Sequence, residues 1–254
     1  MAARDWSRFD HTLAAARKRG FKVIATIGDQ GAGCDPAGYK RASWYSKGYR
    51  KQDPAGTVSY REWVMEIAQR YRDDPTILAW QLINEGQVEK APGTCAPNAA
   101  ELYRNWAADV SGAIKSVDPN HLISIGTIGN GNCGAANDEY KQLHSIPTID
   151  LCEYHDYGGG TNPIPGDRWN GMQVRIDQCN ALNKPLFVGE LGIGRTELGT
   201  LQGRAEALDA KLQAQFSAGI VGVVAWQWWN GSHPRSDGFE IGPGDPALKV
   251  LGSY

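Results

Sequence analysis

Several features that would assign this chain to a common class are missing from its 254 residues. No apolar run is long enough to cross a bilayer, and the first residues, MAARDWSRFD, lack the apolar core of an export signal. Lys and Arg are scattered along the chain and the formal net charge is -2, so the basic patch of a nucleic-acid-binding protein is missing. We therefore expect neither a membrane nor a nucleic acid as a partner.

Cysteine is sparse, and its spacing is unlike that of a metal site. The five cysteines form no CxxC pair, which argues against a bound zinc ion. They are Cys34, Cys95, Cys133, Cys152 and Cys179. If the chain is secreted, Cys95 with Cys133 and Cys152 with Cys179 are the pairs to test as disulfides. Buried free thiols are an equal alternative.

The chain also lacks any segment that would separate two domains. Its composition, 41% hydrophobic and 21% charged, is ordinary for a globular protein with one large core. No Pro/Ser-rich segment or charge run divides it, and barrels of alternating strands and helices often reach this length undivided. We therefore expect residues 1–254 to form a single domain.

Apolar patterns of two kinds alternate along the chain. Helical patterns are clear over residues 7–19, 60–71, 102–117 and 201–216. Near-continuous apolar runs predict parallel strands that are covered on both sides, at residues 21–27, 77–83, 122–127, 149–155, 186–190 and 220–226. This alternation predicts an α/β fold, a TIM (β/α) barrel with about six βα units. An eight-stranded barrel needs two more strands, so we expect an incomplete barrel whose open edges favour self-association.

Polar and aromatic side chains collect at the carboxyl ends of these predicted strands, where parallel α/β folds hold their active sites. They are Asp29, Gln30, Asn84, Glu85, Asn130, His155, Asp156, Tyr157, Glu190, Trp226, Trp228, Trp229 and Asn230. Glycosidic cleavage needs two carboxyl groups, and aromatic faces stack on sugar rings. Glu85 and Glu190 are the candidate pair, and a retaining mechanism requires them to lie about 5–5.5 Å apart.

Four of these strand ends resemble known motifs. ILAWQLINE resembles the fourth-strand motif of the clan A glycoside hydrolases, most closely family 5, the cellulases and β-mannanases. EYHDYG resembles the sixth-strand motif of that family, LFVGELGI the seventh-strand motif and VVAWQWWN the eighth. The four motifs occur in the family's order and cover the family's strands three to eight, so the resemblance implies that its first two strands are absent from this chain.

The resemblance implies roles for the two glutamates and their neighbours. Glu85 would be the acid/base and Glu190 the nucleophile of a double displacement. Asn84 would hydrogen-bond the 2-hydroxyl of the sugar, while His155 and Tyr157 would orient the two carboxyl groups.

Three further residues complete the implied site. Trp226 would stack on the sugar at the cleavage point, with Trp228 as a nearby alternative. Where the family's third strand carries a histidine, this chain has Asp29 or Gln30 at that level. The resemblance thus implies a secreted endo-β-1,4-glycanase that acts on mannan or cellulose-like glucan and needs no cofactor.

Two alternatives come from other observations. Gly129, Gly131 and Gly134 spell GxGxxG after a predicted strand, and Glu153 follows at a distance suited to a ribose-binding acid, so an NAD(P)-dependent oxidoreductase is a minor alternative. We interpret Glu153 instead as a paired structural acid near the site. The two missing strands suggest the other alternative, a degenerate barrel that binds carbohydrate without cleaving it.

Overall fold

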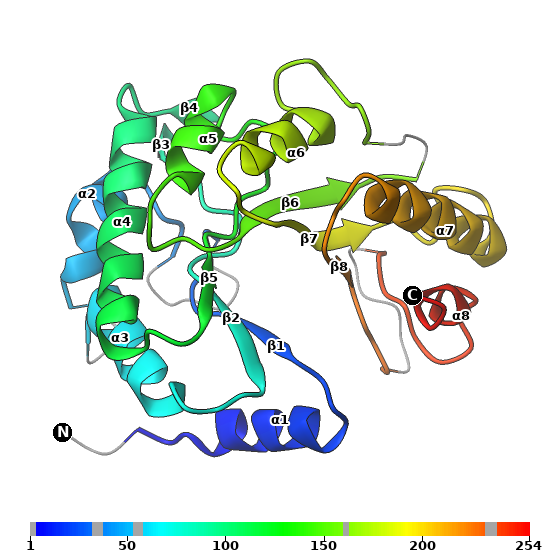
Figure 1. Ribbon diagram of the computed structural model, residues 1–254, viewed down its shortest axis with the longest axis horizontal. Helices are drawn as coiled ribbons and strands as arrows, with labels where there is room; N and C mark the ends of the chain where they lie inside the picture. The colour runs from blue at the N-terminus through cyan, green and yellow to red at the C-terminus, as the bar shows by residue number, and fades with distance from the viewer. Residues whose placement is uncertain (1–3, 32–37, 53–57, 160–162, 232–237) are drawn as a thin grey trace. The chain divides into compact units, whose positions relative to one another are not determined.

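A computed structural model describes residues 4–31, 38–52, 58–159, 163–231 and 238–254 (Figure 1). Cys34 lies outside the described residues. The chain forms two compact units. Unit 1 comprises Met1–Gly126 and Ile146–Asp150, and unit 2 comprises Thr127–Ser145 and Leu151–Tyr254.

Unit 1 is built on a parallel sheet with the strand order β1-β2-β5 (Figure 1). The strands are β1 (Val23–Thr26), β2 (Ile77–Gln81) and β5 (Leu122–Ser124). The helices are α1 (Ser7–Lys18), α2 (Ala42–Ser46), the 3-10 helix η1 (Gly48–Arg50), α3 (Tyr60–Tyr71) and α4 (Ala99–Val117). A short antiparallel hairpin, β3 (Glu89–Ala91) with β4 (Thr94–Cys95), follows β2.

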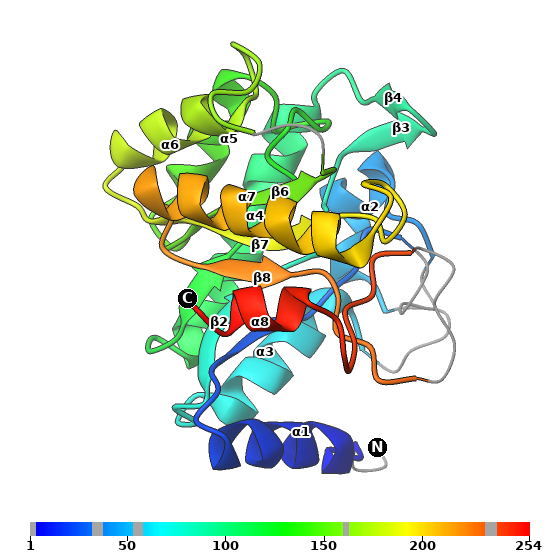
Figure 2. The ribbon, with the colours of Figure 1, turned by 90° about the vertical axis from the view of Figure 1, so that its right-hand side faces the viewer.

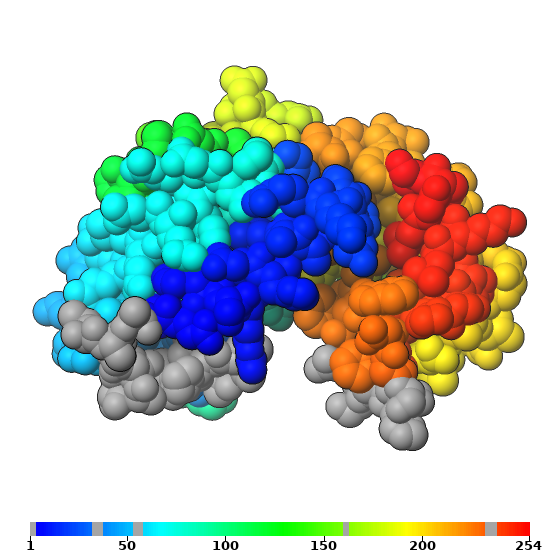
Figure 3. Space-filling view, turned by 90° about the horizontal axis from the view of Figure 1, so that it is seen from below, coloured from blue at the N-terminus to red at the C-terminus, as the bar shows by residue number. Residues whose placement is uncertain are grey.

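The predicted helix at residues 60–71 is confirmed as α3. Ser59 and Glu62 form a reciprocal capping box, which satisfies backbone N–H groups that the first helical turn leaves without partners. In Figure 3 the blue surface of α1 adjoins the cyan surface of α3, and Trp6, just before α1, stacks on Trp63 with ring centroids 5.8 Å apart. These contacts fix the first helix on the outside of the unit.

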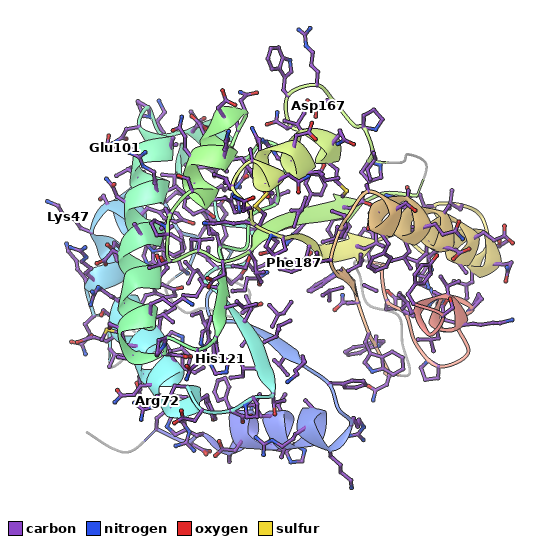
Figure 4. The ribbon with its side chains drawn as sticks, in the orientation of Figure 1. Lys47, Arg72, Glu101, His121, Asp167 and Phe187 are labelled. Carbon is purple, nitrogen blue, oxygen red and sulfur yellow. A yellow bond between two sulfur atoms is a disulfide. The ribbon has the colours of Figure 1, made fainter. Side chains whose placement is uncertain are left out.

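Unit 2 repeats the same plan with the strand order β6-β7-β8. The strands are β6 (Cys152–Tyr157), β7 (Leu186–Gly192) and β8 (Val223–Ala225). The helices are α5 (Asp138–His144), α6 (Met172–Asn180), α7 (Leu201–Ser217) and α8 (Ala247–Leu251), of which α7 and α8 pack on each other (Figure 2). A disulfide between Cys152 and Cys179 joins β6 to α6 (Figure 4).

All six predicted strands are present, with shifted ends. The sixth-strand motif is the clearest case, because the strand expected from residue 149 begins only at Cys152. Asp150 instead belongs to unit 1, where its backbone N–H donates to the carbonyl of Ile123 at 2.9 Å and its carboxylate accepts from the N–H of Ile123. An apolar run does not show at which residue the strand begins, because the segment that leads into the strand is apolar as well.

The alternation of helices and parallel strands confirms the predicted α/β barrel class. Within the described residues the parallel strands form two sheets of three, and no closed barrel is present among them. No helix in the described part of the chain is both long and apolar enough to cross a membrane.

Candidate active site

In unit 1, Asn84 and Glu85 follow β2 at a sharp turn of the backbone. Glu85 has a φ of 52°, a left-handed conformation that few residues other than glycine adopt. Gly86 comes next, in a place where a Cβ atom would lie 2.4 Å from the hydroxyl of Tyr103. A regular strand would send neighbouring side chains to opposite faces. The turn at Glu85 ends this alternation at Asn84 and Glu85, the last two residues of the motif ILAWQLINE.

Asp29 lies at the same level of the unit 1 sheet as Asn84. The two residues form an isolated parallel bridge, in which the N–H of Asn84 donates to the carbonyl of Gly28 at 2.9 Å and the N–H of Gln30 donates to the carbonyl of Asn84 at 3.1 Å. The structure thus brings Asp29 and Asn84 together at the carboxyl ends of neighbouring strands.

Gln30 has a different role from its neighbour Asp29. Its side chain is buried and donates to the carbonyls of Lys40 and Gln87, at 2.8 and 3.0 Å, while it accepts from the hydroxyl of Tyr45. Gln30 therefore ties together the loops that follow β1 and β2. The sequence placed it at the right level, but only the fold shows what it contacts.

In unit 2, the register of β6 against β7 brings Glu190 beside His155. Tyr154 pairs with Val188 and His155 pairs with Glu190, so Gly189 is an extra residue between the two pairs. Such a bulge re-aims the side chains that follow it. It places Glu190 directly across from His155 on the neighbouring strand.

Two side chains of β6 contact the carboxylate of Glu190. The hydroxyl of Tyr157 donates a hydrogen bond to Oε2 of Glu190, and Nδ1 of His155 lies 3.6 Å from the same oxygen. The ring of Tyr157 lies over Gly192, where a Cβ atom would come within 2.4 Å of it. A donated hydrogen bond stabilises an ionised carboxylate, which is the form that a nucleophile requires. His155, Tyr157 and Glu190 are thus gathered within one unit.

Glu153 also contacts His155, a partner that the sequence alone could not identify. Its side chain is fully buried, and its Oε1 lies 3.2 Å from Nε2 of His155. The two residues are two positions apart on β6, so they share a face of the strand. That parity was visible in the sequence and is the signal that links Glu153 to the site.

The tryptophans expected to bind sugar follow β8. The N–H of Trp226 donates to the carbonyl of Leu191 at 2.8 Å, which fixes it at the carboxyl end of the strand. The peptide bond between Trp226 and Gln227 is cis. Trp226 is 36% exposed and Trp228 is 58% exposed, so both rings have open surface. Their stacking on sugar stays a prediction.

The glycine-rich loop after β5 does not have the form of a phosphate site. Gly129, Gly131 and Gly134 all have a positive φ. Phosphate binding needs backbone N–H groups that converge on an anion. In this loop the carbonyls of Gly129 and Asn137 instead accept hydrogen bonds from the buried guanidinium of Arg175, at 2.6 and 2.8 Å. The loop is therefore organised around a cation, which removes the support for a dinucleotide site.

Glu85 belongs to unit 1 and Glu190 to unit 2. Their convergence therefore stays a prediction. The pairing of Cys95 with Cys133, which also belong to different units, stays a prediction as well.

Comparison with known proteins identifies the family of this chain. The model of the cellulase family, glycosyl hydrolase family 5, matches residues 2–232. Mannan endo-1,4-beta-mannosidase F of Aspergillus clavatus is 30% identical over 207 residues, which cover 73% of this chain and 44% of that enzyme. The chain thus spans less than half the length of this curated relative.

Solved structures agree on the fold. The endo-beta-1,4-mannanase of Thermotoga petrophila matches with a TM-score of 0.75 at 23% identity, covering 98% of this chain and 60% of that one. An endoglucanase of Pseudomonas stutzeri in complex with cellobiose matches with a TM-score of 0.64 at 17% identity, covering 99% and 74%. The family match spans nearly the whole chain, and the chain therefore belongs to glycosyl hydrolase family 5.

Proposed function

We propose that this chain is a retaining glycoside hydrolase that cleaves β-1,4-linked polysaccharide by double displacement. Glu190 is the nucleophile and Glu85 the acid/base. The observation that carries the proposal is the contact of Tyr157 and His155 with Glu190 at the carboxyl end of β7, in a chain of this family. These contacts favour a charged, fixed carboxylate, which attack on a sugar carbon requires.

The proposed substrate is mannan, with cellulose-like glucan as the nearest alternative. The relative from A. clavatus is named as a mannan endo-1,4-beta-mannosidase, and the P. stutzeri enzyme holds cellobiose, a β-linked glucose disaccharide. Trp226 and Trp228 offer the exposed aromatic faces that sugar rings stack on. Asn84, beside the acid/base, is the proposed ligand of the sugar 2-hydroxyl.

The test is a panel of β-mannan, glucomannan and soluble cellulose derivatives, read by the release of reducing ends. We expect hydrolysis of mannan, and we expect Glu190→Gln to reduce it to the background level. Glu206→Gln is the matched control, because Glu206 is exposed on α7 and accepts a hydrogen bond from Gln202. Full activity in Glu190→Gln would refute the assignment of the nucleophile. Binding of oligosaccharide by the wild type without hydrolysis would favour the noncatalytic alternative.

The acid/base role of Glu85 has its own test. We expect Glu85→Gln to lower kcat about 10²- to 10⁴-fold on polysaccharide, the usual contribution of general acid–base catalysis. The loss in kcat/KM should be much smaller for an aryl glycoside whose leaving group needs no proton, because kcat/KM reports the first step. On that substrate kcat should still fall, since Glu85 also accepts the proton of the attacking water in the second step. An equal loss of kcat/KM on both substrates would contradict the role.

We further propose that the chain functions outside the cell. The disulfide between Cys152 and Cys179 supports this, because such bonds persist in oxidising compartments. Recovery of the protein only from inside the producing cells, with these two thiols reduced, would contradict it. Self-association through open sheet edges stays a prediction, to be tested by sedimentation.

A further inference from the structure

A row of three side chains crosses the sheet of unit 2. Oε1 of Glu153 lies 3.2 Å from Nε2 of His155, and Nδ1 of the same ring lies 3.6 Å from Oε2 of Glu190. His155 is 2% exposed and Glu153 is 0% exposed, so this end of the row is shielded from bulk solvent. The imidazole thus lies between two carboxyl groups, one on its own strand and one on the next.

We infer that Glu153 is a positioning residue for Glu190 and acts through the ring of His155. The inference rests on the proposed function, and it assigns a role in that reaction to a residue to which the family resemblance gave none. Glu153 contacts neither the sugar nor the reacting atoms in this scheme. Its effect is on the orientation and protonation of the histidine.

The backbone around Glu153 is held in place independently of its carboxylate. The carbonyl of Glu153 accepts from the hydroxyls of Tyr140, at 2.8 Å, and Thr127, at 3.2 Å. The extra residue of β7 provides the space for the side chain, because a Cβ atom at Gly189 would lie 2.1 Å from Oε1 of Glu153. Only glycine at this position leaves the carboxylate where it meets His155.

The chemistry follows from the two nitrogens of the ring. An ionised Glu153 can only accept a hydrogen bond, so it requires a proton on Nε2 of His155. It also stabilises the imidazolium, whose second N–H, on Nδ1, then faces Glu190. Within unit 2, Nδ1 of the ring faces Oε2 of Glu190, and the hydroxyl of Tyr157 donates to the same oxygen. Loss of the Glu153 charge removes what favours the doubly protonated ring, the form in which Nε2 donates to Glu153 while Nδ1 donates to Glu190.

The main test is Glu153→Gln, which keeps the size of the side chain and removes its charge. We expect kcat on mannan to fall roughly 10- to 100-fold, the range seen when the hydrogen-bond partner of a metal-bound histidine is removed, with little change in KM. The acid limb of the kcat/KM profile should move to higher pH, because Glu190 loses support for its ionised form. The ¹⁵N signals of the His155 ring should change together with this shift.

The matched control is Asp156→Asn, on the same strand. Asp156 is also a buried carboxylate, but it pairs with Lys211 of α7 at 2.8 Å and with Gln215. We expect this variant to melt at a lower temperature and to keep the pH profile of the wild type. A merely structural role for Glu153 would make the two variants behave alike.

A second variant leaves both Glu153 and His155 in the chain. Gly189→Ala should displace the carboxylate from the ring and reproduce the shift of the acid limb seen in Glu153→Gln. Wild-type kcat, pH profile and His155 ¹⁵N signals in folded Glu153→Gln would overturn the inference. If the wild type cleaves none of the glycans, the proposed function fails, while the ¹⁵N signals of the two variants still decide whether Glu153 controls His155.

Discussion

Replacement of Arg175 by methionine should destabilise unit 2 strongly, because a buried guanidinium organises the loop after β5. Arg175 is fully buried and donates to the carbonyl of Gly129 at 2.6 Å, to that of Asn137 at 2.8 Å and to Oδ1 of Asn170 at 2.6 Å. Its carbon Cζ lies 4.4 Å from the ring centroid of Tyr140. Methionine keeps an apolar stem of similar reach and removes all three of these donated bonds. The carbonyl of Asn137 still accepts from Gln178, and Oδ1 of Asn170 still accepts from the N–H of Asn137.

The magnitude follows from the number of acceptors that lose a charged partner. A hydrogen bond to a charged group is worth about 1.5–3 kcal/mol. Because two of the three acceptors keep a second donor, we expect the loss of all three bonds to cost about 3–5 kcal/mol in total. In a chain of this size each kcal/mol lowers Tm by roughly 2–4 °C, so we expect Arg175→Met to melt roughly 6–20 °C below the wild type. Arg175→Lys should fall between the two, since one ammonium group cannot reproduce the planar set of guanidinium donors.

The assay is thermal unfolding by circular dichroism, joined to hydrogen exchange of the loop amides from Gly129 to Asn137. The control is Arg168→Met, in the exposed loop that Asp167 marks in Figure 4, where the guanidinium lies over the ring of Trp169. We expect a change below about 0.5 kcal/mol there, as for most surface substitutions. A melting temperature of Arg175→Met within ~2 °C of the wild type would mean a cost under about 1 kcal/mol, which would refute the reasoning.

Three further predictions concern stability. Burial by itself raises the pKa of Asp118, but hydrogen bonds from Trp80 and His121 outweigh it and hold that pKa below its usual value. The stability that Asp118 contributes is therefore present above about pH 3.9, the unfolded value, and is lost as the pH falls through the lower folded value. Asp118→Asn should cost stability at pH 7 and approach the wild type at pH 3 in urea unfolding; a pH-independent gap would contradict this. Replacement of Cys152 and Cys179 by serine opens a loop with a sequence separation of 27 and should cost about 3.5 kcal/mol in urea, and no change would contradict a persistent disulfide. Ser59→Ala removes the capping box of α3 and should cost about 1 kcal/mol, with an unchanged midpoint as the contrary result.

The sequence by itself determined the class of fold and the position of the polar residues at the strand ends. Apolar periodicity and local caps depend on neighbours only a few positions away, so α3 with its Ser59 cap could be predicted from the residues alone. The same holds for the order of strands and helices. Because the carboxyl ends of parallel strands share one edge of a sheet, the strand-end positions of Glu190, His155 and Tyr157 were enough to predict that they lie in one site.

The tertiary structure decided what these side chains contact. The register between two strands far apart in sequence sets the bulge at Gly189, and that bulge determines that Glu190 faces His155. The same register places Gly189 beside Glu153, and the missing Cβ atom leaves room for the carboxylate next to His155. A one-dimensional pattern gives the face on which a side chain lies, but strand register depends on long-range packing, which no local pattern encodes.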